Sequence, residues 1–394
     1  MYACERNFGI NTWDKINSIM ITPKYFIDSL KANQIDFFTG VPDSLLKSIC
    51  AYITDHSDLN NHIIAANEGA AVGLAAGYYL ATGRIPLVYM QNSGIGNAVN
   101  PLVSLTDKEV YNIPLLLLIG WRGEPGLKDE PQHIKQGKIT IPLLNSMGIS
   151  NQVLSKNESE LTCQLKEALA CIETNREPFA FVIQKDTFED YRPQTLENNG
   201  FTLSREEAIK IVSSSMPENA IIVSTTGMIS RELFEYREFM NQNHGKDFLT
   251  VGSMGHASQI SLGIALHKSG RMVYCFDGDG AILMHMGSLA IVGSTKPCNY
   301  VHVVFNNGAH DSVGGQPTVG LKINISEIAV ACGYNLALSV SDLVSLEKAL
   351  NTISNSIGPV LLEIKVKKGA RKDLGRPTRT PIQNKDAFMN FLNQ

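Results

Sequence analysis

Short apolar runs alternate with segments of helical periodicity along almost the whole chain. The runs show little of the alternation that a strand with one face in water needs, so they indicate parallel strands covered by helices on both faces. They lie at residues 36–41, 62–67, 85–91, 113–120, 178–185, 219–227, 247–253, 271–278, 300–308 and 358–366. This pattern predicts an α/β protein built from doubly wound parallel sheets.

The two halves of this pattern repeat each other. Residues 67–94 can be set over residues 253–280 when one residue is inserted in the second copy. Each copy then contains a turn, a helix rich in small residues, a Gly-Arg turn and a buried strand that ends in a polar turn. The matched pairs, in order, are Gly69 with Gly255, Ala71 with Ala257, Gly77 with Gly263, Gly83 with Gly270, and Asn92 with Asp279. Such a run of matches indicates two related domains.

A polar segment with few aliphatic residues, at 187–203, separates the two halves. Its composition is typical of a linker between domains, and it is too short to contain a third domain. We therefore expect an N-terminal extension at 1–20, a first domain at 21–186 and a second domain at 204–394.

The composition excludes several classes of protein. The chain has 394 residues, 44% of them hydrophobic, and a formal net charge of −4, which does not suggest nucleic acid or a membrane surface as a partner. No apolar run reaches the length of a membrane span, and the first 17 residues lack the apolar core of a signal peptide. Seven scattered cysteines without a CxxC spacing indicate reduced thiols. We expect a cytoplasmic protein that acts on a small molecule.

The candidate chemistry begins with FDGDGAILMH, in which Asp279 stands between two glycines at the end of a buried strand. After a spacer of 25 residues from Ala281, Asn306 and Asn307 end another strand. Strand ends of one sheet can converge on a cation, and carboxylate, amide and carbonyl oxygens suit Mg²⁺. A helix that starts near Ala281 would point its free N–H groups at the same place, where they favour a diphosphate. Taken alone, Gly-Asp-Gly is also compatible with an ordinary turn.

A second candidate is Glu68, in the other half of the chain. It stands at the start of a helix rich in alanine and glycine, AANEGAAVGLAAGYYLATG, whose composition indicates close packing. On its own, an acidic residue at this position can serve only to complement the helix dipole.

Together these motifs resemble those of the enzymes that use thiamine diphosphate. Gly-Asp-Gly followed at this spacing by two asparagines is their cofactor signature, and Glu68 matches the buried glutamate of their pyrimidine-binding domain. The resemblance implies that Glu68 bonds the aminopyrimidine ring and promotes the imino tautomer that deprotonates C2 of the thiazolium. It implies that Mg²⁺ is held by Asp279, Asn307 and the carbonyl of Ala309, with Asn306 as the alternative. It also implies a homodimer or higher homo-oligomer whose active sites lie between subunits.

The same resemblance assigns further cofactor contacts. Met254 matches the large apolar residue that holds the cofactor bent, although a methionine there is equally compatible with a core position. The other residues expected at the diphosphate or beside it are Thr225, Thr226, Gly227, Ser253, Gly278, Gly280 and Ala281.

Among these enzymes, two-domain chains of this order resemble the phosphonopyruvate and sulfopyruvate decarboxylases. The resembling stretches begin near residue 21 and include FTGVPDSLLK (38–47), WRGEPGLKDEPQHIKQG (121–137), NNGAHDSVGGQPTV (306–319) and GARKDLGRPTRTPIQNK (369–385). The resemblance implies non-oxidative decarboxylation of 3-phosphonopyruvate through the cofactor's C2 ylide, with protonation to phosphonoacetaldehyde. Sulfopyruvate decarboxylation and an acetolactate-type carboligation are the alternatives. A nucleotide-binding protein is disfavoured because GxGxxG and GxxxxGK[ST] motifs are absent.

Residues for the substrate are predicted from charge and position. Arginine can hold a tetrahedral anion with two hydrogen bonds, so Arg122 and Arg376 are candidates for the phosphonate. Asp43 and His310 follow buried strands and are candidates for proton transfer; a turn-forming aspartate and a surface histidine are the alternatives. Asn92, which corresponds to Asp279 in the repeat, and the adjacent Ser93 are expected to bind substrate, and these assignments complete the predicted site.

Overall fold

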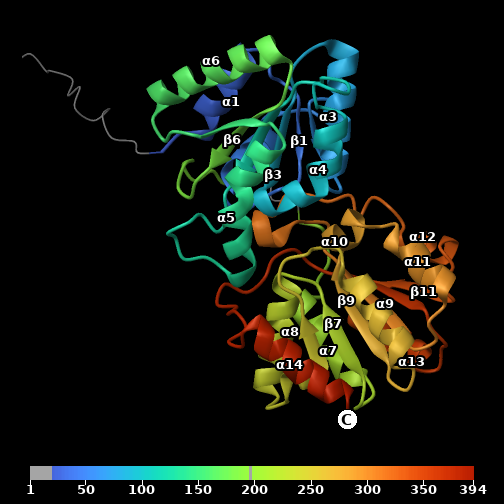
Figure 1. Cartoon of the computed structure of the whole chain (residues 1–394). Helices are drawn as coiled ribbons and strands as arrows, with labels where there is room; N and C mark the ends of the chain where they lie inside the picture. Colours follow the sequence, from blue (N-terminus) through green and yellow to red (C-terminus); the bar gives the residue numbers. More distant parts are fainter. Residues whose placement is uncertain (1–19, 195–197) are drawn as a thin grey trace, which may run out of the picture.

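The computed structural model describes residues 20–194 and 198–394. Figure 1 shows two halves, the first coloured blue to green and the second yellow-green to red, with α5 and α10 beside the junction between them. The predicted extension at 1–20 lies, apart from Met20, outside the described residues, and so do residues 195–197 of the predicted linker.

The first half contains a six-stranded sheet in the order β2-β1-β3-β4-β6-β5, and all its strand pairs are parallel. Its strands are β1 (Phe38–Gly40), β2 (His62–Ile64), β3 (Leu87–Gln91), β4 (Leu116–Gly120), β5 (Ser150–Val153) and β6 (Phe179–Ile183). Its helices are α1 (Pro23–Ala32), α2 (Lys47–His56), α3 (Glu68–Thr82), α4 (Ile95–Ser104), α5 (Pro131–Ser146), α6 (Glu158–Asn175) and the 3₁₀ turn η1 (Asn92–Gly94).

The second half contains another parallel six-stranded sheet, in the order β11-β12-β10-β9-β7-β8. Its strands are β7 (Ile221–Ser224), β8 (Asp247–Leu249), β9 (Val273–Gly278), β10 (Tyr300–Asn306), β11 (Leu336–Val340) and β12 (Val360–Lys365). Its helices are α7 (Arg205–Ser215), α8 (Met228–Phe239), α9 (Ala257–His267), α10 (Asp279–Met284), α11 (Ser288–Thr295), α12 (Ile325–Ala331), α13 (Leu343–Ser354) and α14 (Pro381–Leu392), with 3₁₀ turns η2 (His244–Lys246) and η3 (Asp311–Val313).

The two sheets have the same topology. If the strands of each half are numbered along the chain, both sheets read 2-1-3-4-6-5. In the repeat found in the sequence, β3 corresponds to β9, and both strands lie in the interior of their sheets. The prediction of two related doubly wound parallel-sheet domains is therefore confirmed.

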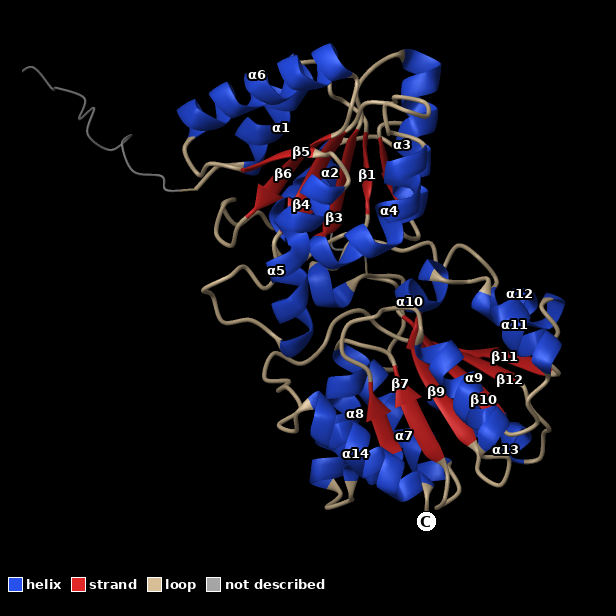
Figure 2. Cartoon of the chain, in the orientation of Figure 1, coloured by secondary structure: helices blue, strands red, loops and turns tan. Residues whose placement is uncertain are grey.

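Both faces of each sheet are buried, as the apolar runs predicted. In β4, Leu116 and Leu118 pack into one cluster, whereas Leu117 and Ile119 pack into another on the opposite face. Figure 2 shows helices on both sides of the strands in each half. A pleated strand places successive side chains on opposite faces, so a continuous apolar run is required here.

Two strands were missed by the sequence pattern, and both lie at sheet edges. β5, with the sequence SNQV, is exposed or half-buried throughout, and β11 is buried only at Val340. An edge strand buries less surface than an interior strand, so its sequence does not need the apolar run on which the prediction depended. The helix expected near Ala281 is α10, which begins at Asp279 and ends at Met284.

The carboxyl ends of the strands meet at the junction of the two halves. Figure 2 shows β7 and β9 running toward this junction. Asn67, which precedes α3, donates a hydrogen bond to the carbonyl of Met284 at 3.2 Å, and Gln316 donates to the carbonyl of Lys47 at 3.3 Å. Loops after the strands of both sheets therefore lie against one another, which is where doubly wound sheets place their ligands.

The structure also bears on membrane spans and on the cysteines. None of the helices within the described ranges is long and apolar enough to cross a membrane. The six cysteines in these ranges are all free, and Cys50 and Cys275 are buried.

Candidate active site

Asp279 follows β9 directly, and its carboxylate is buried at the junction of the two halves. It is only 2% exposed, and no lysine, arginine or histidine within the described residues forms an ion pair with it. Burial raises its pKa from 3.8 to about 6, against hydrogen bonds from Thr318 and from nearby backbone groups. A buried carboxylate without a cationic partner is costly, so this site is suited to a bound cation.

The two asparagines lie beside Asp279 because β10 pairs with β9, with Phe305 opposite Gly278. Asn306 is fully engaged: its amide donates to the carbonyl of Gly320 and to Glu363, and its oxygen accepts from the backbone of Gly308. A side chain with all these protein partners holds the loop together. Asn306 is therefore the weaker candidate for a metal ligand.

Asn307 is the stronger candidate. Its Oδ1 accepts one hydrogen bond, from the backbone N–H of Ala309 at 3.0 Å, and can still offer a lone pair. Within the described residues no hydrogen bond ends on the carbonyl of Ala309. The oxygens of Asp279, Asn307 and Ala309 form a hard donor set of the kind that Mg²⁺ prefers, so the residues fit the predicted metal.

The predicted diphosphate turn follows β7, which pairs with β9 on the side opposite β10. Gly227 has a φ of +101°, which favours glycine, and it precedes α8 without any side-chain cap. Thr226 accepts a hydrogen bond from the N–H of Gly252, which ties this turn to the segment before Met254. The turn therefore presents free helix N–H groups next to β9, the strand that precedes Asp279.

Gly280, Met254 and His310 converge at the same place. A Cβ atom at Gly280 would lie 3.1 Å from the His310 ring and 3.4 Å from the methyl of Met254, so a larger residue would crowd both. Met254 is half-buried and Ser253 before it is exposed, with a left-handed φ of +47°. Both side chains thus lie at the edge of the site rather than in the core, and Ala281 is buried in α10.

Glu68 lies at the start of α3, after the N-cap Asn67, and is 5% exposed. Its Oε2 accepts a hydrogen bond from Asn97 at 2.7 Å. A Cβ at Gly94 would lie 2.3 Å from Oε1 of Glu68, so only glycine leaves room for this side chain. Beside Gly94, the carboxylate is enclosed at the carboxyl edge of the first sheet, whereas a carboxylate that merely complements a helix dipole is usually exposed.

The other predicted residues of the first half lie at the same edge. Asp43 is fully buried, accepts hydrogen bonds from the N–H of Leu45 and from Gln91, and so forms the turn that was its alternative role. Asn92 donates to the carbonyl of Arg122 and to Thr140, so its amide joins β3 to the segment after β4. Ser93 is exposed and donates to Gln91. Catalysis by Asp43 and substrate binding by Asn92 and Ser93 stay predictions.

Both arginines predicted for the phosphonate carry acidic partners. Arg122 makes a two-point contact with Asp129 and donates to Ser44 at 2.7 Å, and Arg376 pairs with Glu130. An anion at either arginine would have to compete with a carboxylate that is already in place.

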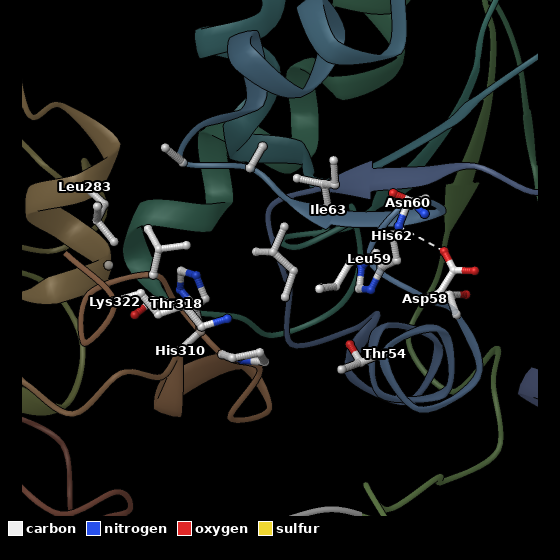
Figure 3. Close-up of a pocket in the computed structure, with 17 residues that line it drawn as sticks. Thr54, Asp58, Leu59, Asn60, His62, Ile63, Leu283, His310, Thr318 and Lys322 are labelled. Atoms are coloured by element: carbon white, nitrogen blue, oxygen red, sulfur yellow. Dashed lines mark hydrogen bonds between the residues drawn. The ribbon is translucent and has the colours of Figure 1, made fainter. Parts of the chain in front are cut away.

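His310 faces a cavity of about 630 Å³ between the two halves (Figure 3). Thr318, Lys322 and Leu283 flank it on one side, and Leu59 and Ile63 lie across from them. Burial lowers the pKa of His310 to about 4, so the ring is neutral near pH 7. The alternative of an ordinary surface histidine does not fit this placement.

Three residues of the site were missed by sequence reasoning. Thr318 bonds Asp279, Asp311 bonds Asn307, and Arg231 lines a cavity of about 310 Å³ together with Thr226 and Arg376. Thr318 and Asp311 belong to the stretch after the two asparagines, where a search of that loop for polar residues would have found them. No motif marks Arg231, because it lies in the first turn of α8, whose sequence is that of a common amphipathic helix.

Comparison with protein families identifies the cofactor of this site. The family described as "Thiamine pyrophosphate enzyme, N-terminal TPP binding domain" matches residues 20–141, and the corresponding C-terminal TPP binding domain matches residues 225–364. The chain belongs to the thiamine pyrophosphate (thiamine diphosphate) enzymes. The first range contains Glu68 and the second contains Asp279, so the resemblance found in the sequence is confirmed.

Individual relatives match nearly the full chain. A phosphonopyruvate decarboxylase of Streptomyces viridochromogenes is 33% identical over 368 residues, which cover 90% of each chain. One of Streptomyces hygroscopicus is 31% identical over 391 residues, 95% of each chain. A sulfopyruvate decarboxylase of Methanosarcina acetivorans is 29% identical over 337 residues, 80% of this chain and 83% of the relative.

Proposed function

We propose that this thiamine diphosphate enzyme decarboxylates 3-phosphonopyruvate to phosphonoacetaldehyde and CO₂, as a step of phosphonate biosynthesis. The observation that carries the proposal is the similarity to two streptomycete phosphonopyruvate decarboxylases over 90% or more of both chains. Only 21 residues separate the end of β6 at Ile183 from the start of α7 at Arg205, which is too short for a further domain. This length argues against an acetolactate-type carboligase.

The cofactor would lie between the Glu68 edge of one subunit and the Asp279 edge of the other. In this assignment Asp279, Asn307 and the carbonyl of Ala309 hold Mg²⁺, which is supported by the buried, unpaired carboxylate. The turn at Thr225–Gly227 and the backbone of Gly278–Ala281 would receive the diphosphate. Bound there, the cofactor supplies a thiazolium that accepts the electron pair released with CO₂.

The chain's own residues would transfer protons at the cofactor ring and at the reacting carbon of the substrate. Glu68 is 5% exposed and its Oε2 accepts a hydrogen bond from Asn97, and in this assignment its carboxylate would face the aminopyrimidine ring and exchange a proton with it. His310, held neutral by burial, and Asp43 are our candidates for proton transfer at the reacting carbon. A surround of low polarity at the reacting carbon would favour loss of the substrate's carboxylate charge.

For the phosphonate we add Arg231 to the predicted Arg122 and Arg376. Arg231 is half-buried and forms no ion pair with any residue that the structure describes, and burial lowers its pKa. An arginine in that position gains from an anionic ligand, whereas Arg122 and Arg376 are already neutralised by Asp129 and Glu130. We therefore regard Arg231 as the main phosphonate contact.

We further propose a homodimer, in which halves from two subunits complete each site. Its support is an apolar face that repeats in both halves: Leu80 on α3 is 73% exposed, and Leu266, its counterpart on α9, is 49% exposed. At the neighbouring Gly77 and Gly263, no atom lies within 4 Å of the position that a Cβ would take, so both helix faces are open to close packing. Light scattering of the wild type and of Leu80→Asp tests this arrangement. We place the enzyme in the cytoplasm, consistent with its free thiols.

The deciding experiment is turnover of 3-phosphonopyruvate, sulfopyruvate and pyruvate side by side, with Mg²⁺ and thiamine diphosphate present. We expect the highest kcat/KM on 3-phosphonopyruvate. Sulfopyruvate is the second candidate substrate because of the relative from Methanosarcina acetivorans. A preference for sulfopyruvate, or carboligation without release of an aldehyde, would replace the proposal.

A further inference from the structure

The side chain of Asn307 is connected by hydrogen bonds to a series of charged residues, of which Asp311 is half-buried and Arg205 and Glu232 are buried. Its Nδ2 donates to Oδ2 of Asp311 at 2.6 Å. The same oxygen accepts from Nη1 of Arg205 at 3.1 Å. Arg205 then uses its remaining nitrogens for a two-point contact with Glu232, at 2.8 and 3.0 Å. Glu232, Arg205, Asp311 and Asn307 are therefore connected in series, from α8 through α7 to the metal-binding loop.

This chain determines which end of the Asn307 carboxamide faces the site. Because Nδ2 is fixed on a carboxylate, Oδ1 must point away from Asp311, toward the N–H of Ala309. Only the oxygen can bind a cation. A flipped amide would bring two N–H groups toward Mg²⁺ and would leave Asp311 without its donor.

The surroundings restrain the same loop at two more points. Asn199, at the end of the segment between the halves, donates to the carbonyl of Asn307 at 3.0 Å and to that of Val366 at 2.9 Å. The backbone N–H of Gly369 donates to Oδ2 of Asp311 at 3.0 Å. Asp311 thus receives three donors on one oxygen and joins the loop to the basic segment that follows β12.

We propose that Arg205 and Asp311 are positioning residues of the metal site, which hold Asn307 with its oxygen turned toward the cation. Arg205 and Glu232 are 5% and 2% exposed, and loss of the arginine would leave the carboxylates of Glu232 and Asp311 without their shared cation. The proposal rests on the proposed function, since it takes Asn307 as a ligand of Mg²⁺.

The test is the Mg²⁺ affinity of variants, measured by calorimetric titration of Mg²⁺ into apoprotein with saturating thiamine diphosphate. Arg205→Met and Asp311→Asn should each weaken Mg²⁺ binding by roughly 10- to 100-fold, as is usual when a partner of a metal ligand is lost. Arg205→Lys keeps the positive charge and one donor group, so its Mg²⁺ affinity should lie between that of these variants and that of the wild type. It replaces Arg205→Met in the test if Arg205→Met does not fold.

Arg237 provides a matched control. It lies on α8, is 1% exposed and, like Arg205, makes a two-point contact with a buried carboxylate, Asp247, at 2.7 and 3.0 Å. Arg237→Met should lower the free energy of unfolding yet leave Mg²⁺ affinity within about twofold. Equal loss of affinity in this control, or unchanged affinity in folded Arg205 and Asp311 variants, would overturn the inference. A wild type that binds no thiamine diphosphate with Mg²⁺ would instead contradict the proposed function.

Discussion

Thr318 follows Asp279 by 39 residues, and its hydroxyl donates a hydrogen bond to the Asp279 carboxylate. The backbone at Gly320 packs on the same group, since a Cβ there would lie 2.8 Å from Oδ2 of Asp279 and 2.9 Å from Oδ1 of Asn306. The loop after β10 thus packs over the end of β9 and buries Asp279. Among the described residues the carboxylate has hydrogen-bond donors but no cationic side chain as a partner, and this arrangement leads to the first two predictions.

If Asp279 binds Mg²⁺, Asp279→Ala should abolish Mg²⁺-dependent binding of thiamine diphosphate while the fold survives, because the diphosphate would meet the site without its cation. Calorimetric titration with the cofactor, alongside circular dichroism, measures both. Thr318→Val is the milder comparison, since it removes one hydrogen bond and keeps the carboxylate. Cofactor affinity that is undiminished in folded Asp279→Ala would remove this residue from the metal site.

The same carboxylate should reduce the stability of the apoprotein at neutral pH. In the unfolded chain it ionises near its ordinary value of 3.8, whereas the folded protein keeps the proton until about pH 6. Ionisation therefore favours unfolding increasingly from pH 4 to 6, and the loss is constant above that window. Between pH 4.5 and 7.5 the wild type should lose about 2 kcal/mol relative to Asp279→Asn.

Urea unfolding of both metal-free proteins at the two pH values checks this prediction. Adding Mg²⁺ and thiamine diphosphate should restore stability to the wild type alone, because only it keeps the charged ligand. A stability difference between Asp279→Asn and wild type that does not change with pH would show that Asp279 is already ionised at low pH.

Glu68→Gln should bind the cofactor normally through its diphosphate but lose proton transfer at the pyrimidine ring. NMR of bound cofactor should show C2–H exchange slowed by roughly 10²- to 10⁴-fold, the usual contribution of a positioned acid or base. Asn97→Ala removes the partner of Glu68 but keeps the carboxylate, so it should slow exchange far less. Normal exchange in Glu68→Gln would reduce Glu68 to a helix-end carboxylate.

The sequence predicted the parts of this molecule that depend on local pattern. Interior strands such as β4 are apolar on both faces, and the positions of Asp279 and Asn307 follow from strand ends, so both were accessible to periodicity and spacing. The edge strand β5 was not, because its polar sequence resembles a loop. Pairings between distant segments were also inaccessible. Nothing in the sequence around Arg122 indicates that its guanidinium pairs with Asp129 rather than with a substrate anion.

This distinction between paired and unpaired arginines leads to the last prediction. Near pH 7 a phosphonate carries more negative charge than a sulfonate, so a cation at that end should discriminate among ketoacids that share the carboxylate. Arg231→Gln should lower kcat/KM on 3-phosphonopyruvate by about 10- to 200-fold, the equivalent of one charge-assisted contact of about 1.5–3 kcal/mol. Turnover of pyruvate and affinity for thiamine diphosphate should barely change.

Arg376→Gln and Arg122→Gln are the matched comparisons, because each removes an arginine that already has a carboxylate partner. We expect smaller, or substrate-independent, losses from both, since the phosphonate gains little from a neutralised cation. If Arg231→Gln instead weakens cofactor binding and lowers turnover of all ketoacids equally, Arg231 contacts the diphosphate of the cofactor. If Arg376→Gln alone discriminates between substrates, then the phosphonate displaces Glu130, and the exposed basic segment after β12 is its binding site.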